Sequence, residues 1–353
     1  MCVPSVKSFA GLITTMYEPT VKPPRLRKGG TIRIIAPSSA ATSTSSLPKA
    51  VRFLEKQGFK VSLAPSMIRE SPTRYLTAGD ATRKNEIENA FKSDKYDAIM
   101  VLQGGAGSID ILNSIDYDII KDHPKVFIGY SDITLLQLAF MRMAHMASFQ
   151  GPMLIDLFEE DEVALQTNWN NLIGIISRGE EAMIKNPLES GWAKSINDGT
   201  TKGQLMGGNL TVFSLIVGTK YIPDARGKVL FFEDVNVEPW MLDNLLTSLV
   251  IKGVLKKANG IVFGQLPNYG IENISESQGV TSYLMKHLFI EDYINATMHS
   301  TLQDLFSNKM PKKPAFIEFA CCHGKYITTI PMGIRVKMDA SECTMEMLEP
   351  GVE

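Results

Sequence analysis

The sequence has few cysteines, four among 353 residues. Cys2 is terminal, Cys321 and Cys322 are adjacent, and Cys343 stands alone. This spacing gives neither a disulfide framework nor a paired set of metal ligands. We therefore expect a protein of the reducing cytoplasm. We also expect no cofactor.

The sequence also lacks an excess of charge and any long apolar run. A net charge of −2 and a pI near 6.3, without a block of Lys or Arg, disfavour binding to a nucleic-acid polymer. No run approaches the roughly 18 apolar residues of a membrane helix, and the apolar patch at 9–13 has no basic start. We expect a small-molecule or peptide substrate, no membrane segment and no signal peptide. Residues 1–29 form a leader in this interpretation, with Met16 as an alternative start to Met1.

The first part of the chain alternates between strand-like and helix-like runs. At 353 residues and 44% hydrophobic, the chain can form two domains, each with its own core. The alternation predicts an α/β fold with a parallel, doubly wound sheet over residues 30–155. Ligands of such sheets bind at the carboxyl ends of the strands. Predicted strands cover 31–37, 59–64 and 98–102 and a fourth starts at 126, and predicted helices cover 47–58, 82–91 and 135–146.

The composition changes after this unit. Residues 156–202 contain an acidic cluster and the lone Trp192, and we interpret them as a linker or lid. A second alternating unit then runs over 203–353 and predicts a C-terminal α/β domain. Its predicted strands cover 229–232, 260–263, 315–319 and 333–338, and its predicted helix covers 239–255.

Ser131 lies where the fourth predicted strand turns into a helix. Such a turn exposes a hydroxyl at the carboxyl end of a sheet, close to the positive end of a helix, which is a typical position for a nucleophile. The pattern is G-x-S-x-I and not the full G-x-S-x-G elbow, so an ordinary turn is the alternative. The N–H of Asp132 is a candidate oxyanion donor, which leaves its side chain to cap the helix from Ile133 onward.

A serine nucleophile needs a base, and a carboxylate that orients the base. Among the histidines, His323 is distinguished because it follows a buried-looking strand, although a packed imidazole is the alternative. Glu233 directly follows an apolar strand, where a carboxylate is costly unless it has a partner. Asp234 or Glu238 could instead be a helix-capping acid before Pro239. The competing histidines are His123, His145, His287 and His299.

The loop Gly104-Gly105-Ala106-Gly107 follows the third predicted strand. It could hold a phosphate, but it lacks the spacing of a phosphate-binding loop, and no acidic residue follows at the distance of a dinucleotide fold. Its other use is to present a backbone N–H, that of Gly105, to an oxyanion.

Five motifs occur together in one order, and as a set they resemble the LD-carboxypeptidase family of serine peptidases. The resemblance covers nearly the whole chain from about Gly30. The residues from Cys321 to Ala340 look most like the microcin C immunity branch of that family. The motifs are the Gly-Gly-x-Gly loop, Gly129-Tyr130-Ser131-Asp132-Ile133-Thr134, Gly207-Gly208-Asn209-Leu210, Phe232-Glu233-Asp234, and His323 followed by Pro331-Met332-Gly333.

The resemblance implies Ser131 as nucleophile, His323 as general base and acid, and Glu233 as the orienting carboxylate. It implies a flavodoxin-like N-terminal domain, a swivelling α/β C-terminal domain, a homodimer and no metal. It also suggests Trp192 and Asn209 as substrate contacts, and for Trp192, a single Trp in this region, a packing role is the alternative.

The resemblance is compatible with two classes of substrate. The immunity branch cleaves an amide that joins an aminoacyl group to a nucleotide-like moiety, whereas true LD-carboxypeptidases release D-alanine from a murein tetrapeptide. The peptidoglycan-cleaving branch usually has Arg where Gln103 stands and an aromatic residue where Ala106 stands. A relative that only binds a ligand is the alternative outside enzymes.

Overall fold

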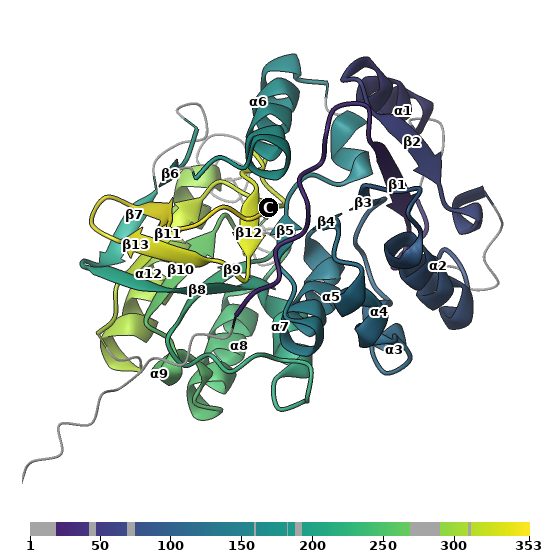
Figure 1. Ribbon diagram of the computed structural model, residues 1–353. Coiled ribbons are helices and arrows are strands. Elements are labelled where there is room, and N and C mark those ends of the chain that lie inside the picture. Colours follow the sequence, from purple (N-terminus) through teal and green to yellow (C-terminus); the bar gives the residue numbers. More distant parts are fainter. Residues whose placement is uncertain are drawn as a thin grey trace, which may run out of the picture.

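The computed structural model describes residues 19–41, 47–68, 75–158, 160–181, 183–187, 193–268, 290–309 and 312–353. Trp192 and His287 therefore lie outside the described residues. Two β-sheets with their helices build the molecule (Figure 1). Among the described residues, no helix is long and apolar enough to cross a membrane.

The first sheet has the order β12-β5-β4-β3-β1-β2. Strands β1 to β5 pair in parallel, and β12 pairs antiparallel with β5. The order β2-β1-β3-β4-β5 is that of flavodoxin-like sheets, so this part of the expected fold is confirmed. The strands are β1 (Thr31–Ile35), β2 (Lys60–Leu63), β3 (Ala98–Val101), β4 (Val126–Ile128), β5 (Ser148–Gln150) and β12 (Ile330–Met332).

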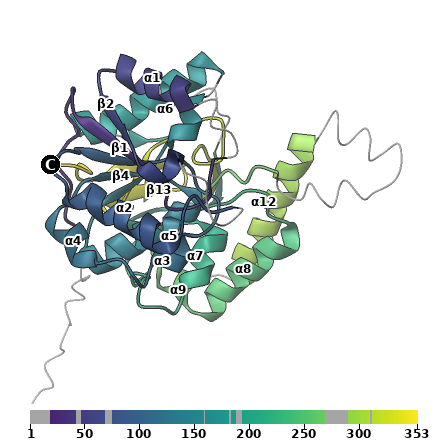
Figure 2. The ribbon, with the colours of Figure 1, turned by 90° about the vertical axis from the view of Figure 1, so that its right-hand side faces the viewer.

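Helices cover both faces of this sheet, α1 on one and α2, α4 and α5 on the other (Figures 1 and 2). The central strands β3 and β4 are fully buried for that reason, which explains their continuous apolar sequences. The helices are α1 (Leu47–Lys56), α2 (Asp80–Lys92), α3 (Ser108–Ile111), α4 (Tyr117–Asp122) and α5 (Thr134–Ala139), and short helical turns are η1 (Pro65–Ile68), η2 (Ser131–Ile133), η3 (Phe140–Ala144) and η4 (Leu154–Phe158).

The second sheet has the order β6-β14-β13-β8-β9-β10-β11-β7. Its central strands β8 to β11 pair in parallel, and antiparallel strands flank them on both sides. The strands are β6 (Met183–Ile184), β7 (Lys194–Asn197), β8 (Thr200–Asn209), β9 (Lys228–Glu233), β10 (Gly260–Gly264), β11 (Ala315–Phe319), β13 (Arg335–Asp339) and β14 (Thr344–Met347), and the helices are α7 (Leu210–Ile216), α8 (Pro239–Ile251), α9 (Val254–Lys257) and α12 (Ile290–Asn308).

The described part of the predicted linker has regular structure. It contains the helix α6 (Glu162–Ile173), which continues into η5 (Gly174–Arg178), and it supplies β6 and β7 to the second sheet. In the opposite direction, β12 comes from the predicted C-terminal domain and pairs in the first sheet. The chain therefore crosses between the two sheets more than once.

Two predicted helices differ from the observed ones. The predicted helix 239–255 ends at Ile251 and restarts as α9, because Gly253 adopts a positive φ of +74°. The predicted helix 135–146 is α5 followed by the wider turn η3, and it ends at His145, whose φ is +54°.

Candidate functional site

Three loops of the first sheet meet at the carboxyl ends of β1, β3 and β4. The order of the strands reverses between β1 and β3, which is where open α/β sheets bind ligands. Ser131 follows β4 with a φ of +64°, an uncommon conformation for a residue with a side chain. This strained turn between a strand and a helix is the geometry of a nucleophile elbow.

Glycine is required where the loop after β3 passes this turn. A Cβ on Gly104 would lie 2.8 Å from Cβ of Ser131 and 3.0 Å from its Oγ. Gly105 has a φ of +106°, and a Cβ there would collide with the side chain of Ser39. The Ser39 hydroxyl accepts a hydrogen bond from the N–H of Ala106 at 3.0 Å. The loop thus lies directly against Ser131.

The side chain of Asp132 does not cap the helix that follows it, and that prediction is wrong. It is buried and accepts hydrogen bonds from the Ser38 hydroxyl at 2.7 Å and from the N–H of Ser108 at 2.9 Å. Burial raises the pKa of Asp132, while these hydrogen bonds act in the opposite direction. The carboxylate therefore joins the loops after β1 and β3 to the Ser131 turn.

His323 and Glu233 come together at the carboxyl ends of β11 and β9. Nδ1 of His323 lies 2.6 Å from Oε2 of Glu233, whose side chain is fully buried. With Nδ1 bonded to the carboxylate, Nε2 is the ring nitrogen left for proton transfer. The pair thus has the arrangement of a base and the acid that orients it.

The environment raises the pKa of both partners. Burial acts to lower the pKa of His323, but the hydrogen bond and the charge of Glu233 outweigh it, and Asp234 and Asp156 act in the same direction as Glu233. Burial also raises the pKa of Glu233, and His323 opposes that shift. A buried carboxylate at 2.6 Å therefore favours the imidazolium form.

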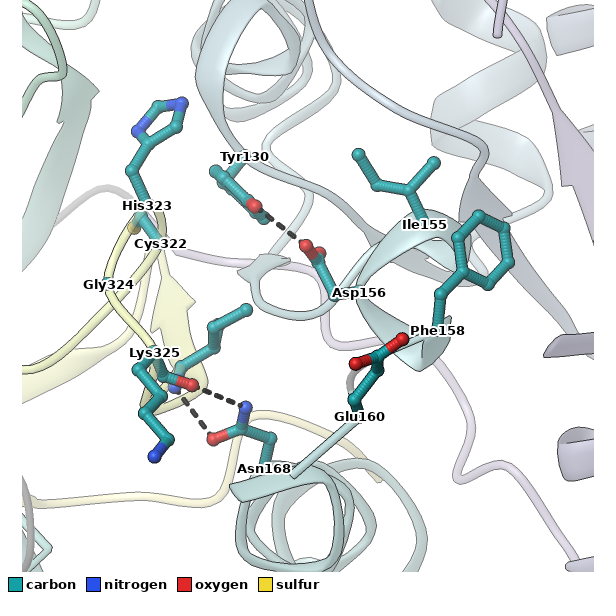
Figure 3. A pocket seen from close by; sticks show the side chains of 11 residues that line it. Tyr130, Ile155, Asp156, Phe158, Glu160, Asn168, Cys322, His323, Gly324 and Lys325 are labelled. Atoms are coloured by element: carbon teal, nitrogen blue, oxygen red, sulfur yellow. Dashed lines mark hydrogen bonds between the residues drawn. The ribbon is translucent and has the colours of Figure 1, made fainter. Parts of the chain in front are cut away.

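Tyr130 connects the two halves of the site. Its ring packs edge-on against the ring of His323, with centroids 5.1 Å apart. Its hydroxyl donates to Oδ1 of Asp156 at 3.0 Å, and Figure 3 shows the two side chains pointing toward each other. Since Tyr130 directly precedes Ser131, this contact links the His323 loop to the turn that carries Ser131.

Asn209 ends β8 beside Glu233 and is buried. Its Nδ2 donates to Oδ1 of Asp234 at 3.1 Å, and its Oδ1 accepts from the N–H of Val212, which caps α7. Asp234 also accepts from the N–H and hydroxyl of Thr211. Asp234 therefore stabilises the start of α7, and Glu238 at the start of α8 makes no side-chain cap. A substrate contact of Asn209 stays a prediction.

The remaining candidates lie apart from this cluster. His123 ends α4 and is exposed, His145 ends η3, and His299 lies on α12. Burial raises the pKa of the thiols of Cys321 and Cys322, which keeps them as unreactive thiols.

A cavity of about 440 Å³ opens beside His323 (Figure 3). It lies between η4, α6 and the loop that follows His323. Its volume is within the usual range of small-molecule sites. Its walls are apolar at Tyr130, Ile155, Phe158 and Ile327, and charged or polar at Asp156, Glu160, Asn168 and Lys325.

Sequence reasoning missed several side chains that hold the site together. Ser38 lies in the loop after the first strand, and its position at the carboxyl edge of the sheet was a usable signal. Gln103 donates to the carbonyl of Ala40 at 2.7 Å and so fixes the same loop. Asn168 reaches the His323 loop from α6, and nothing in its helical sequence context indicates that contact.

Comparison with known families and sequences gives consistent matches. The family models for the LD-carboxypeptidase N-terminal and C-terminal domains match residues 32–151 and 202–338. A protein named probable murein peptide carboxypeptidase, from Bacillus subtilis (strain 168), is 30% identical over 96% of this chain and 97% of its own length. The microcin C7 self-immunity protein MccF of Escherichia coli is 25% identical over 92% of this chain and 94% of its own length.

Solved structures match over similar lengths. MccF in complex with aspartyl sulfamoyl adenosine has a TM-score of 0.79 at 22% identity, covering 94% of this chain and 100% of the other. The muramoyltetrapeptide carboxypeptidase from Oxalobacter formigenes has a TM-score of 0.73 at 26% identity, covering 90% of this chain and 97% of the other. Both likenesses extend across the two sheets.

Proposed function

Since the chain belongs to the LD-carboxypeptidase family and is therefore a peptidase, we propose that it cleaves an amide bond with Ser131, His323 and Glu233 as its triad. The observation that carries this proposal is the 2.6 Å contact between His323 and Glu233, which come from different strands. Tyr130 joins this pair to the strained turn at Ser131.

In the proposed mechanism, Ser131 Oγ attacks the carbonyl carbon while Nε2 of His323 takes the hydroxyl proton. The buried carboxylate of Glu233 stabilises the imidazolium that forms. The N–H groups of Gly105 and Asp132 hold the oxyanion, and one such donor is typically worth about 3 kcal/mol of barrier. His323 then protonates the leaving amine, and a water molecule releases the acyl group by the same route in reverse.

Two substrate classes fit this chemistry. Sequence identity favours a murein peptide, because the relative named for it is 30% identical against 25% for MccF. MccF is also similar in sequence and in fold, and one structure of MccF is a complex with aspartyl sulfamoyl adenosine. We propose hydrolysis of an amide in a small peptide or an aminoacyl-nucleotide, with release of D-alanine from a murein tetrapeptide as the second candidate.

Mass spectrometry of reaction products decides between the two. The purified enzyme is incubated with a murein L,D-tetrapeptide and, separately, with an aminoacyl sulfamoyl adenylate, with Ser131→Ala as the matched control. Release of D-alanine from the first substrate alone identifies a murein carboxypeptidase. Cleavage of the second alone identifies an immunity-type amidase.

The same experiment tests the proposed nucleophile. Ser131→Ala should lower turnover by about 10⁶-fold, to below detection, while the thermal unfolding curve stays close to that of the native protein. A serine-directed phosphonate should label Ser131 in the native enzyme. A protein that is not labelled and leaves both substrates intact is a ligand-binding relative, and the proposal is then wrong.

The family resemblance also implies a homodimer in the cytoplasm. The molar mass from light scattering of the purified chain tests the first of these expectations, because a dimer has twice the 39.0 kDa of the chain. Fractionation of the producing cell tests the second.

A further inference from the structure

The loop that carries His323 has strained backbone and little regular structure. After β11 ends at Phe319, the chain forms turns and bends until β12. Glu318 and Cys322 have φ values of +63° and +55°, although neither is glycine. Such residues cost free energy and persist only where the surrounding structure determines their conformation. The contacts that hold this loop are therefore a part of the site.

Two asparagines of α6 bind the backbone after His323. Asn168 uses both ends of its amide: Nδ2 donates to the carbonyl of Lys325 at 3.1 Å, and Oδ1 accepts from the N–H of Ile327 at 2.7 Å. Oδ1 of Asn171 accepts from the N–H of Thr329 at 2.6 Å. Figure 3 shows the Asn168 amide aimed at this backbone. The contacts fall on alternate residues, as they would in a paired strand.

A third asparagine binds the backbone before His323. Nδ2 of Asn186 donates to the carbonyl of Glu318 at 2.8 Å, and its Oδ1 accepts from the N–H of Ala320 at 2.9 Å. These two bonds span the strained position and the end of β11. The pairing of β10 with β11 shifts register in the same place, which is the mark of a β-bulge that redirects a strand.

We propose that Asn168 and Asn186 are positioning residues, which hold His323 against Glu233 by taking the place of a neighbouring strand on both sides of its loop. The three asparagines lie within the segment 156–202 that the sequence suggested as a lid. In its described part this segment is thus the support of the catalytic base. The inference rests on the proposed role of His323.

The consequence is a dependence of the rate on residues that contact no reacting atom. Without the Asn186 amide, the loop is free to leave the conformation in which Nδ1 faces Glu233. A misplacement of about 1 Å at a catalytic group can cost about 10²-fold in rate. We expect Asn186→Ala to lower kcat by about 10- to 100-fold with little change in KM, because Asn186 does not line the cavity.

The experiment compares Asn186→Ala with Asn170→Ala. Asn170 is an exposed asparagine on α6 whose side-chain oxygen accepts from its helix neighbour Gln166, so its loss should leave kcat unchanged. The near-isosteric Asn186→Asp and Asn168→Asp keep the acceptor and lose the donor. They should fold normally and lose about 3- to 30-fold in kcat, which keeps the test decisive if an alanine variant does not fold.

A pH profile separates positioning from a merely structural role. If His323 leaves Glu233, its raised pKa falls, so the acid limb of kcat/KM should move to lower pH in Asn186→Ala and Asn186→Asp. In a Glu233→Gln background the Asn186 substitution should shift the pH midpoint little further, because the charge that raises the pKa of His323 is already absent.

Two outcomes distinguish this inference from the proposed function. If the Asn186 and Asn168 variants have the same kcat and the same pH midpoint as Asn170→Ala, the positioning role is wrong and the proposed function still stands. A fully active His323→Ala variant overturns the proposed function, and the inference with it.

Discussion

The two halves of the site are held in different ways. On the nucleophile side, Ser131, the Gly105 loop and Ser38 follow strands of one sheet, and short backbone turns and one carboxylate, Asp132, fix them. On the base side, His323 lies in an irregular loop whose backbone is bound by side chains from more than 130 positions earlier in the chain. The proposed nucleophile is thus held by loops of a single sheet, and the loop of the proposed base by side chains from the segment 156–202.

The largest effect should come from breaking the base side at its charged contact. Glu233→Gln removes the charge that stabilises the imidazolium but keeps the shape, and kcat/KM should fall by about 10⁴-fold. Asp234→Asn is the comparison, because it removes a nearby charge that also raises the pKa of His323 but leaves the hydrogen bond between His323 and Glu233 in place. A rate of Glu233→Gln close to that of the native enzyme would assign the orienting role to another acid.

An intermediate effect should come from the nucleophile side. Gly105→Ala forces a residue with a side chain into a φ of +106° and pushes Cβ into Ser39, so the N–H of the loop moves away from the oxyanion. We expect kcat to fall by about 10²- to 10³-fold with KM nearly unchanged. Gly79→Ala is the matched control, because Gly79 has a φ of −64° and open space around it. Equal rates for the two variants would exclude the loop from the oxyanion hole.

The pH dependence of kcat/KM tests the base side separately from the nucleophile side, because it depends on the protonation of His323. His323 must be neutral to take the serine proton, and its pKa is raised above 6.5 by Glu233. The value of kcat/KM should therefore be constant at high pH and fall with decreasing pH through a midpoint above 6.5. A profile of kcat/KM against pH, measured at constant ionic strength, checks this prediction. A midpoint below 6.5 would show that His323 is not held against the carboxylate.

The smallest effect should come from Asp156, which connects the halves through Tyr130. Asp156→Asn removes a negative charge that raises the pKa of His323, so the acid limb should move by a fraction of a pH unit to lower pH. Tyr130→Phe keeps the ring on His323 and removes the hydroxyl, and its midpoint should stay where it is in the native enzyme. A shift of the same size in both variants would mean that the charge of Asp156 is not the cause.

Most of the nucleophile half could be predicted from the sequence, since it consists of local motifs. The short apolar strands, the glycines after β3 and the Gly-x-Ser turn after β4 each have a signature within about ten residues. The prediction failed for the side chain of Asp132, because its partners Ser38 and Ser108 are brought to it by neighbouring strands. The adjacency of strands depends on tertiary packing.

On the base side, the sequence indicated the residues Glu233 and His323 but not the side chains that hold the His323 loop in place. Glu233 was singled out because a carboxylate after an apolar strand is costly without a partner, and His323 because it follows a buried-looking strand, while their roles came from the family resemblance. The breaks in helix α8 and in the helix after α5 were missed, since a single Gly253 or a terminal His145 in the left-handed region is a weak signal.

By itself the sequence determined the α/β alternation, the two sheets and the family, because these follow from local hydrophobic patterns and ordered motifs. Only the tertiary structure decided that Asn168 and Asn186 bind the backbone on either side of His323, and that β12 returns to the first sheet. An amide that replaces a strand has no periodicity of its own. Buried backbone N–H and C=O groups need hydrogen-bond partners, and the packing of the whole molecule determines which side chain supplies them.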